Sequence, residues 1–576
     1  MNKFLTRFSF LACTCSLFLQ AGGQNPVISK PAYDNITPDS VTVLWETDIP
    51  SDSKVCWMVS DSNYQPVVFT DSSYSGNSVT SHAMTIGPLD PATIYRYMVS
   101  SGTGTGTASD SGYLVTASLS DGNVEVYFNH TVDTAVSTGK NAQGNADFES
   151  LFNNRISNAT HSIDITMWVF SEITSVATSL IDAKARGVKI RFIYDSSPNT
   201  PLIDTLIAHG IQVVKRNYDT VGFSMHDKFW IFDYRYNTDP SKMYLWTGST
   251  NVSHAMFHED RNNIIVIRDE SLCAVYTHEF EEMWGSHTDE ADISRARFGR
   301  EKTDNVPHIL NIGGTRMEVY FAPTDSISDT ICSIISSRAE KSLLFCMYKF
   351  NLPSVEESLH EVYQKGIQVS GVFDSSNSTV HGSAFPRMKG KAVPGAWDPP
   401  ADVFIDTIPG LLHHKYFLVD ADSAGPERII VTGSYNWEIP AEEGNDENML
   451  VIHDSQINNL YFQEFCARYK ESGGTLIGNG TGIGHPPAAP GELQCRVYPN
   501  PFCRTATFSF VIRNRGNVKL VVFDRMGNTM CVPVDQEMIP GTHMASFNAD
   551  GIPGGLYYYR LTAGDCSVAG KLILIR

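Results

Sequence analysis

Short runs in which apolar and polar residues alternate fill the chain from residue 25 to residue 118. One of them reads VTVLWET at 41–47, and stretches rich in Ser, Thr, Asp and Gly separate it from the next. Alternation turns one side of an extended segment toward a core and the other toward solvent, which is typical of antiparallel strands. The pattern therefore predicts a β-sandwich over residues 25–118.

Farther along the chain, helical periodicity alternates with short apolar runs. The segment IDAKARGVKIRFIYD at 181–195 has a counterpart at 359–374, and each reads as a helix closed by glycine, then an apolar strand that ends in aspartate. Strands this apolar are buried on both faces, which is typical of an α/β layer. The repeat therefore predicts one double domain with pseudo-twofold symmetry, made of lobe 1 at 124–300 and lobe 2 at 306–472.

Each predicted lobe carries the same set of polar residues. The first set reads HDKFWIFD at 226–233 and GSTN at 248–251, and the second reads HHKYFLVD at 413–420 and GSYN at 433–436. The histidine and the lysine occupy alternate positions of a strand, so both side chains point to one face. Histidine, lysine and asparagine side chains that meet from two such strands form a cationic pocket rich in donors. Such a pocket suits the non-bridging oxygens of a phosphodiester.

Two copies of HxKxxxxD, each followed by GSxN, resemble the signature of the phospholipase D superfamily. The resemblance extends from about residue 124 to residue 472. It implies that the two lobes share one site, which hydrolyses a phosphodiester through a phosphohistidine without a metal ion or other cofactor.

The resemblance also assigns a role to each member of the two motifs. His226 is expected to attack phosphorus, and His413 to protonate the leaving alcohol and then to activate water. The remaining members are expected to hold phosphoryl oxygens (Lys228 and Lys415), to bind substrate (Ser249, Asn251, Ser434 and Asn436) or to hold their loops by hydrogen bonds (Asp233 and Asp420).

One position differs between the two copies. In the second copy the resemblance assigns Glu447 to orienting the histidine of its own half, but the aligned residue of the first copy is Asn262. An amide stabilises an imidazolium less than a carboxylate does. Three alternatives follow: Asn262 weakens lobe 1, Asp260 or Glu259 replaces the carboxylate, or the two histidines exchange roles.

The two ends of the chain read as export signals. Residues 1–23 combine a basic start, an apolar run too short to span a bilayer, and small residues, which is typical of a cleaved secretory signal. Residues 473–494 are rich in Gly and Pro and read as a linker. Residues 495–576, with VYPNPF at 497–502 and GGLYYYRL at 554–561, resemble the sorting domain of type IX secretion substrates and are expected to form a small β-sandwich. This resemblance implies passage across the outer membrane to the surface or the medium, and contact with the secretion machinery.

The N-terminal β segment has a resemblance of its own. LDPATIYRY at 89–97 resembles the tyrosine corner of fibronectin type III domains, with Trp45 as the core tryptophan. Such a domain usually spaces or binds, so it selects no chemistry.

Charge bears on the substrate. The 576 residues carry a formal charge of −20, and residues 124–472 hold 29 Lys and Arg against 47 Asp and Glu. This balance disfavours a long basic track for nucleic acid and favours phospholipid headgroups as substrate. The alternatives are a secreted metal-independent endonuclease of the same superfamily and a non-catalytic surface-binding protein. We expect a monomer without a transmembrane anchor.

Overall fold

The structure is a computed structural model that describes most of the chain between residues 25 and 574. The described residues are 25–29, 31–60, 66–104, 106–195, 201–216, 222–422, 428–477, 482–483, 495–498, 502, 504–512, 515–525, 527–538, 541–549, 551–564 and 566–574. The predicted signal segment and most of the predicted linker lie outside these ranges. One compact unit contains the N-terminal strands and both lobes, and another contains residues 387–402 and the C-terminal strands.

The N-terminal strands form an antiparallel sheet in the order β1-β2-β4-β5, with β3 paired to β2. The long strand β2 joins β1 and β3 along its first half and β3 and β4 along its second, with a bulge between. Its strands are β1 (Ala32–Asp34), β2 (Val41–Val59), β3 (Asp71–Ile86), β4 (Ile94–Gly102) and β5 (Thr107–Val115).

The tyrosine corner has a counterpart in this sheet. The Tyr95 hydroxyl accepts a hydrogen bond from the Asp90 backbone N–H at 2.9 Å, and Trp45 is buried in the core. A β-rich N-terminal segment is compatible with the predicted fibronectin type III domain, which stays a prediction.

Lobe 1 is built on a seven-stranded sheet with the order β6-β12-β11-β10-β7-β8-β9. The strands β7, β8 and β9 are parallel, and the other neighbours are antiparallel. The elements are β6 (Val124–Phe128), α1 (Phe148–Asn158), β7 (Ser162–Met167), α2 (Thr174–Ala185), β8 (Lys189–Asp195), α3 (Pro201–Ala208), β9 (Gln212–Arg216), β10 (Lys228–Phe232), β11 (Tyr244–Gly248), α4 (His254–His258), β12 (Asn263–Ile267) and α5 (Glu270–Trp284), with short 3₁₀ turns at Thr134–Val136, Pro240–Lys242 and Gly299–Glu301.

Lobe 2 repeats this arrangement. Its sheet has the order β13-β14-β20-β19-β18-β15-β16-β17, so the seven strands from β14 onward match lobe 1 position for position. The elements are β13 (Ile309–Ile312), β14 (Thr315–Ala322), α6 (Ile327–Arg338), β15 (Ser342–Met347), α7 (Pro353–Gln364), β16 (Gln368–Phe373), α8 (Phe385–Met388), β17 (Asp402–Ile405), β18 (Lys415–Val419), β19 (Ile429–Gly433), α9 (Ile439–Glu443), β20 (Glu447–Ile452) and α10 (Ser455–Glu471). The sequence repeat is therefore a structural repeat.

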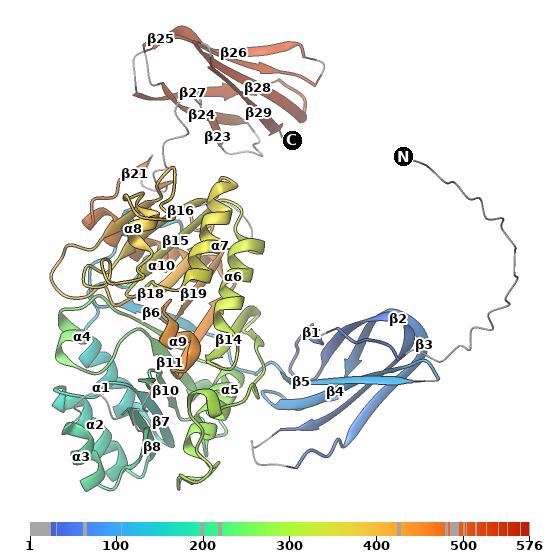
Figure 1. The fold of residues 1–576 in the computed structure, drawn as a ribbon, viewed down its shortest axis with the longest axis vertical. Coiled ribbons are helices and arrows are strands. Elements are labelled where there is room, and N and C mark those ends of the chain that lie inside the picture. The colour runs from blue at the N-terminus through green and yellow to red at the C-terminus, as the bar shows by residue number, and fades with distance from the viewer. Residues whose placement is uncertain are drawn as a thin grey trace, which may run out of the picture. The chain divides into compact units, whose positions relative to one another are not determined.

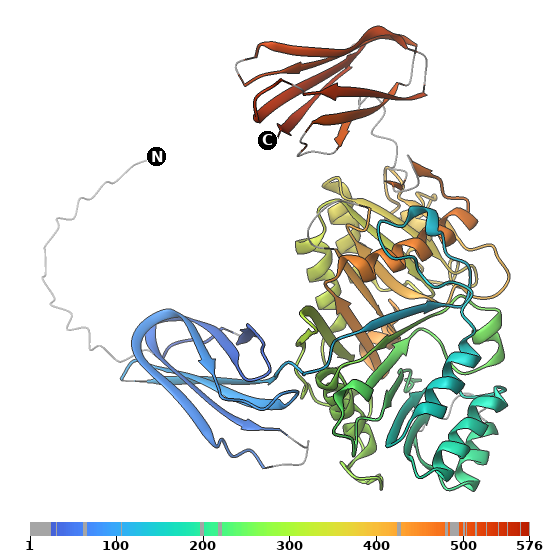
Figure 2. The same ribbon diagram turned by 180° about the vertical axis from the view of Figure 1, so that it is seen from behind.

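Helices cover the sheets, as the apolar strands require. Figure 1 shows α1, α2 and α3 together beside the lobe 1 sheet and α6 and α7 beside the lobe 2 sheet, and Figure 2 shows the same layers from behind. In lobe 1 the three helices share one core with β7, β8, β10 and β11. The helices α5 and α10 are buried along most of their length. Helix α10 contacts both β18 and β19 of its own lobe and β6 of lobe 1, so it helps to join the lobes.

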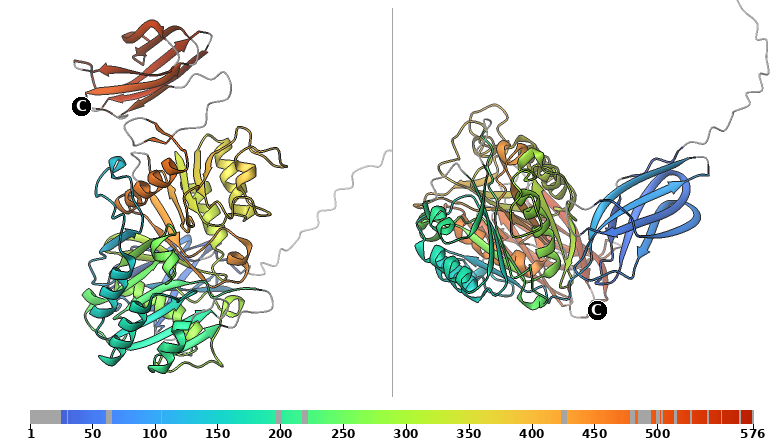
Figure 3. Two further views of the ribbon diagram at one scale, coloured as in Figure 1. Left: turned by 90° about the vertical axis from the view of Figure 1, so that its left-hand side faces the viewer. Right: turned by 90° about the horizontal axis from the view of Figure 1, so that it is seen from below.

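The C-terminal unit is rich in strands, as Figure 3 shows. It contains a sheet in the order β23-β24-β27 and a second in the order β26-β25-β28-β29, and residues of both sheets share one core. The strands of this end of the chain are β21 (Leu476–Ile477), β22 (Gly482–Ile483), β23 (Cys495–Tyr498), β24 (Thr505–Ile512), β25 (Gly516–Phe523), β26 (Thr529–Met538), β27 (Gly541–Asn548), β28 (Gly555–Ala563) and β29 (Cys566–Leu574).

Candidate functional site

The two HxK motifs meet where the lobes touch. Each histidine precedes its motif strand, β10 or β18, and its backbone is bound to the opposite lobe. The His226 N–H donates to Asp446 O at 2.9 Å, and the His413 N–H donates to Arg261 O at 3.0 Å. Because both of these hydrogen bonds between the lobes lie beside the motif residues, the fold places both histidines in one buried region.

A second pair of contacts holds the chain just ahead of each histidine. The Met225 N–H donates to Asp195 Oδ2 at 2.8 Å, and the Leu412 N–H donates to Asp374 Oδ2 at 2.9 Å. These aspartates end the two repeated strands β8 and β16 or follow them directly. The sequence repeat contained this signal, but the prediction gave neither aspartate a role.

The orienting partner of each histidine comes from the opposite lobe. His226 Nδ1 lies 2.8 Å from Glu447 Oε2, and His413 Nδ1 lies 3.0 Å from Asn262 Oδ1. The prediction that Glu447 orients the histidine of its own half is therefore wrong. The physical reason is that backbone bridges join the two lobes here. They bring the start of β20 beside the lobe 1 motif and the start of β12 beside the lobe 2 motif.

The carboxylate and the amide leave the two histidines in different electrostatic surroundings. Burial raises the pKa of Glu447 to about 7. Burial, together with the charge of Lys228, holds the pKa of His226 well below its usual range. Above pH 7 this favours a neutral imidazole whose Nδ1–H donates to an ionised Glu447, so that Nε2 carries the lone pair of the ring.

The amide of Asn262 has a fixed orientation. Its Nδ2 donates to Met256 O at 3.0 Å, so Oδ1 faces His413, whose Nδ1 must then be the donor. Burial, with the charges of Lys415 and Lys228, holds the pKa of His413 well below its usual range. An imidazolium at this position would be a strong acid.

The motif lysines and two aromatic rings surround the histidines. Lys228 Nζ donates to His226 O at 2.5 Å and Lys415 Nζ donates to His413 O at 2.7 Å. Burial lowers the pKa of Lys228 to about 8. The ring of Trp168 lies 4.9 Å from that of His226, and the ring of Tyr348 lies 4.8 Å from that of His413. The sequence prediction named neither aromatic residue.

The two motif serines hold the orienting residues. Ser249 Oγ donates to Asn262 Oδ1 at 2.9 Å, and Ser434 Oγ donates to Glu447 Oε2 at 2.7 Å. Both were predicted to bind substrate, but each hydroxyl proton is already used within the protein. The two serines therefore hold the residues that orient the histidines.

The two motif asparagines differ in which end of the amide is free. Asn251 Oδ1 accepts from the Val169 N–H at 3.3 Å, which leaves Nδ2 buried without a partner. Asn436 Nδ2 donates to Glu438 Oε1 at 3.2 Å, which leaves Oδ1 buried without a partner. Only Asn251 thus presents a free donor in the position predicted to bind phosphoryl oxygens.

The two motif aspartates lie at the far ends of β10 and β18. Asp233 accepts from the backbone N–H groups of residues 160, 161 and 162, and Asp420 accepts from those of residues 340, 341 and 342. Both adopt a positive φ, near 55°, which aspartate tolerates better than most residues. Each carboxylate fastens the turn ahead of β7 or β15.

The motif glycines permit a close approach of two strands. A Cβ atom on Gly248 would lie 2.3 Å from Asn263 O, and one on Gly433 would lie 2.2 Å from Asn448 O. Their φ angles of 146° and 150° also lie in the region that favours glycine. Glycine at this position lets the following serine reach Asn262 or Glu447.

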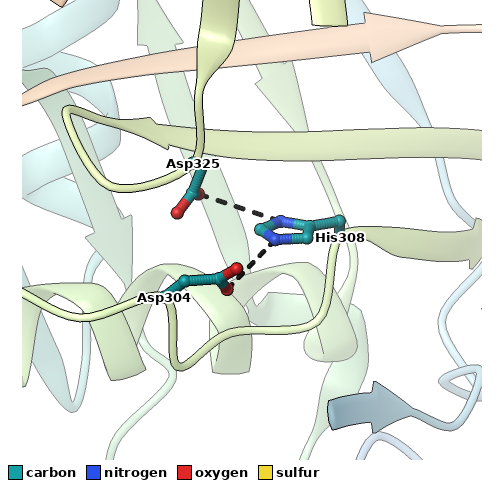
Figure 4. Close-up of side chains that lie close together, drawn as sticks. All are labelled: Asp304, His308 and Asp325. Atoms are coloured by element: carbon teal, nitrogen blue, oxygen red, sulfur yellow. Dashed lines mark hydrogen bonds and ion pairs between the residues drawn. The ribbon is translucent and has the colours of Figure 1, made fainter. Parts of the chain in front are cut away.

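One group of side chains in the described part of the chain has the composition of a metal site. Asp304, just ahead of lobe 2, lies together with His308 and Asp325 of that lobe, as Figure 4 shows. His308 Nε2 lies 3.2 Å from Asp304, while Nδ1 lies 2.9 Å from Val319 O and 3.8 Å from Asp325. The two carboxylates therefore face opposite sides of the ring, which fits a protonated histidine better than one bound ion.

Family models match both parts of the chain. The model described as "Cardiolipin synthase, PLD-like domain" matches residues 152–284 and 331–469, one copy in each lobe. The model described as "Secretion system C-terminal sorting domain" matches residues 496–575. The second match indicates export across the outer membrane to the cell surface or the medium. No helix among the described residues is long and apolar enough to span a membrane.

Individual relatives are distant. Mitochondrial cardiolipin hydrolase of Homo sapiens is 28% identical over 140 residues, which are 24% of this chain and 49% of that protein. Phospholipase D of Rickettsia bellii is 24% identical over 183 residues, which are 31% of this chain and 84% of that protein. The chain thus spans about half the length of the human relative.

Solved structures resemble the chain only weakly. Phosphatidylserine synthase of Haemophilus influenzae Rd KW20 matches with a TM-score of 0.41 and 13% identity over 60% of this chain and 86% of its own. A score this low says nothing about substrate. The two motif copies and the matched models agree, however: each central lobe carries a PLD-like domain, and the chain ends in a secretion system C-terminal sorting domain.

Proposed function

We propose that the protein is an exported phosphodiesterase that hydrolyses the headgroup bond of phospholipids through a phosphohistidine. The observation that carries the proposal is the unequal pairing of the two buried histidines, His226 with the carboxylate of Glu447 and His413 with the amide of Asn262. Because their partners differ, the two histidines are suited to different steps.

His226 is suited to attack. Its Nδ1–H donates to Glu447, so Nε2 carries the lone pair, and the carboxylate stabilises the positive charge that the ring gains when the N–P bond forms. As this bond forms, the bond from phosphorus to the leaving oxygen breaks. The proton for that oxygen comes from Nε2 of His413.

His413 is suited to give a proton and take one back. Its neutral partner Asn262 does not stabilise the imidazolium as a carboxylate would, so the ring releases its proton readily. In the second step water attacks phosphorus while His413 accepts a proton from the water. The N–P bond then breaks and frees His226, and the ring of His413 is again protonated for the next cycle.

The remaining motif residues support the negative phosphoryl group. Lys228 and Lys415 bring two ammonium groups beside the histidines, and Asn251 offers its free Nδ2. Donors fixed before the substrate arrives stabilise the transition state without reorganisation. We assign no role to a metal ion in this scheme.

Two facts favour lipid as substrate. Relatives of the lobes are named cardiolipin hydrolase and phospholipase D. The lobes also carry an excess of acidic residues, 47 against 29 basic ones between residues 124 and 472, which opposes general binding of nucleic acid. The sorting domain fits an enzyme that meets its substrate outside the cell.

The test compares lipid and nucleic acid as substrates of the purified full chain in the presence of a chelator. Release of the headgroup alcohol from mixed phospholipid vesicles is expected, and His226→Ala and His413→Ala are each expected to abolish it. His254→Ala is the matched control, since His254 lies exposed on lobe 1. Cleavage of plasmid without lipid turnover would make the protein an endonuclease. If neither substrate reacts, the surface-binding alternative stands in place of the proposal.

A further inference from the structure

A residue two positions ahead of Glu447 makes a hydrogen bond across the lobes. Asn445 Oδ1 accepts from the Ser224 N–H at 2.9 Å, and Ser224 lies two positions ahead of His226. Asn445 is buried. Because a backbone N–H only donates, the amide must present its oxygen to Ser224, and its nitrogen faces another neighbour.

That neighbour is the carboxylate of Glu447. Asn445 Nδ2 donates to Oε1 at 3.2 Å. The other oxygen, Oε2, accepts from Ser434 and lies beside His226 Nδ1. Hydrogen bonds therefore hold both oxygens of the carboxylate. One amide thus joins the chain just ahead of the histidine to the carboxylate that orients this histidine.

The equivalent residue of lobe 1 makes the first of these contacts. Asp260 lies two positions ahead of Asn262, and its Oδ1 accepts from the Leu411 N–H at 2.7 Å. Leu411 lies two positions ahead of His413. An ionised carboxylate has no proton to donate. Asp260 can therefore hold the backbone ahead of its histidine, but it cannot donate to a neighbouring carboxylate as Asn445 does.

The two contacts of Asn445 have different effects. The contact with the backbone needs only an oxygen, which asparagine and aspartate both supply. The contact with Glu447 needs a donor, and a donor to a carboxylate favours its ionised form. Burial opposes that form and raises the pKa of Glu447 to about 7, whereas the charge of Lys228 and the hydrogen bonds from Ser434 and Asn445 lower this pKa.

Other charged or titratable groups act on Glu447 from both lobes. They comprise an imidazole, two ammonium groups, two carboxyl groups and a phenol, which belong to His226, Lys228, Lys415, Asp227, Glu438 and Tyr435. Substitution of Asn445 leaves all of these groups in place. A change in the titration of Glu447 in such a variant is therefore attributable to Asn445.

We infer that Asn445 is a positioning residue for the reaction, because its amide holds Oε1 of Glu447 and so aligns Oε2 with Nδ1 of His226. It acts through Glu447 and forms no bond to the reacting phosphorus. The inference rests on the proposed function, since it concerns the attack by His226. Without this donor, Glu447 takes up a proton at higher pH and supports the attack less well there.

The test measures kcat of the full chain as a function of pH on bis(4-nitrophenyl) phosphate, with the released nitrophenol read after an alkaline stop. This leaving group needs little help from an acid, so the rate depends more on the attack by His226 than on proton transfer from His413. The fall of kcat on the acid side, called the acid limb here, is expected near pH 7 in the wild type, because Glu447 loses its charge there.

Two variants of Asn445 separate its two contacts. Asn445→Asp keeps an acceptor for the Ser224 N–H, removes the donor to Glu447 and adds a negative charge. It should move the acid limb to higher pH by about 1 to 2 units, as loss of one hydrogen bond to a charged group does. Asn445→Ala adds no charge and should move the limb in the same direction by less. Asn154→Asp, the same substitution at an exposed residue of α1, is the matched control and should leave the limb in place.

A double variant distinguishes positioning from a general effect on structure. In the Glu447→Gln background no carboxylate remains at this position to titrate. Asn445→Asp should therefore shift the acid limb of the residual activity far less than it does in the wild type. If Asn445→Ala fails to fold because it also loses the contact with the backbone, Asn445→Asp alone decides, since it keeps that contact.

Failure of the inference and failure of the proposed function give different results. An acid limb that stays in place in Asn445→Asp, or a fall of kcat that is equal at every pH, would refute the positioning role while the hydrolase remains. A shift of the same size in the Glu447→Gln background would refute it as well, because Asn445 would then act through another group. Absence of wild-type turnover on phospholipid vesicles and on the nitrophenyl compound alike would refute the proposed function itself.

Discussion

Replacement of Glu447 by glutamine separates the catalytic role of its charge from the effect of that charge on stability. The amide keeps the shape and the hydrogen bond from Ser434, but it removes the ionised partner of His226. A hydrogen bond to a charged group is worth about 1.5–3 kcal/mol, so kcat should fall by about 10- to 100-fold. Because the bond matters when the ring becomes cationic, formation of the phosphohistidine is the step that slows.

The same substitution should change stability in the opposite direction. Burial raises the pKa of Glu447 from its ordinary 4.5 to about 7, which corresponds to about 3 kcal/mol. A group whose pKa is higher in the folded state binds more protons there, so its contribution to stability decreases as pH rises from 4.5 through 7. Glutamine does not titrate. Relative to the wild type, Glu447→Gln should therefore gain up to about 3 kcal/mol of unfolding free energy between pH 4.5 and pH 8.

Rapid-quench kinetics and urea unfolding at several pH values measure the two effects. Asn262→Asp is the matched control, because it adds a carboxylate opposite His413 and sets an oxygen against Met256 O. It should slow turnover of lipids, whose leaving alcohols need a proton, more than turnover of bis(4-nitrophenyl) phosphate, and it should destabilise the fold. The reasoning is refuted if Glu447→Gln changes kcat less than threefold, or if its stability difference from the wild type does not vary with pH.

Four further outcomes follow from the structure. KM should rise above about pH 8, where Lys228 loses its charge, and a pH series of initial rates tests this. Asp420→Ala should lower the unfolding free energy by about 2–4 kcal/mol in urea titrations, since three backbone N–H groups lose their acceptor. Gly433→Ala should yield little folded protein, because its Cβ would lie 2.2 Å from a carbonyl oxygen of β20, whereas Gly516→Ala, with nothing within 4 Å, should fold normally by circular dichroism. Burial alone would lower the pKa of His308, but its hydrogen bond to a carboxylate raises that pKa. The charged ring therefore stabilises the fold fully below about pH 6.5, and this stabilisation is lost as pH rises through the raised pKa. The thermal unfolding temperatures of His308→Gln and the wild type should then converge at alkaline pH.

Local spacing made the motif residues predictable. The HxK spacing predicts that the histidine and the lysine share one side of an extended segment, although in the structure each histidine lies just ahead of its strand. Two copies inside a repeat imply one shared centre. The structure has the same strand order in both lobes, as that reasoning requires. The roles of Asp233 and Asp420 were accessible for the same reason, because each lies at the end of a strand away from the histidine.

The partner of Glu447 was not predictable in this way. Alignment of the two copies shows that Glu447 and Asn262 are equivalent, but equivalence does not say which histidine each one faces. The pairing depends on backbone hydrogen bonds between the lobes, in which the Asp446 and Arg261 carbonyls accept from the backbone N–H groups of the motif histidines of the opposite lobe. These contacts join residues more than 150 positions apart, and no periodicity or spacing encodes them.

The swapped partners change what the difference at Asn262 means. Within one lobe, the amide would have been a defect in the nucleophile, and exchange of roles between the histidines would have been one remedy. Across the lobes, the carboxylate faces His226 and the amide faces His413, so one difference gives the two rings different hydrogen-bond partners. A repeat with pseudo-twofold symmetry begins with two identical histidines, and a phosphohistidine mechanism needs one nucleophile and one acid. Replacement of a single carboxylate by an amide breaks the symmetry at the atoms where the proposed reaction needs it.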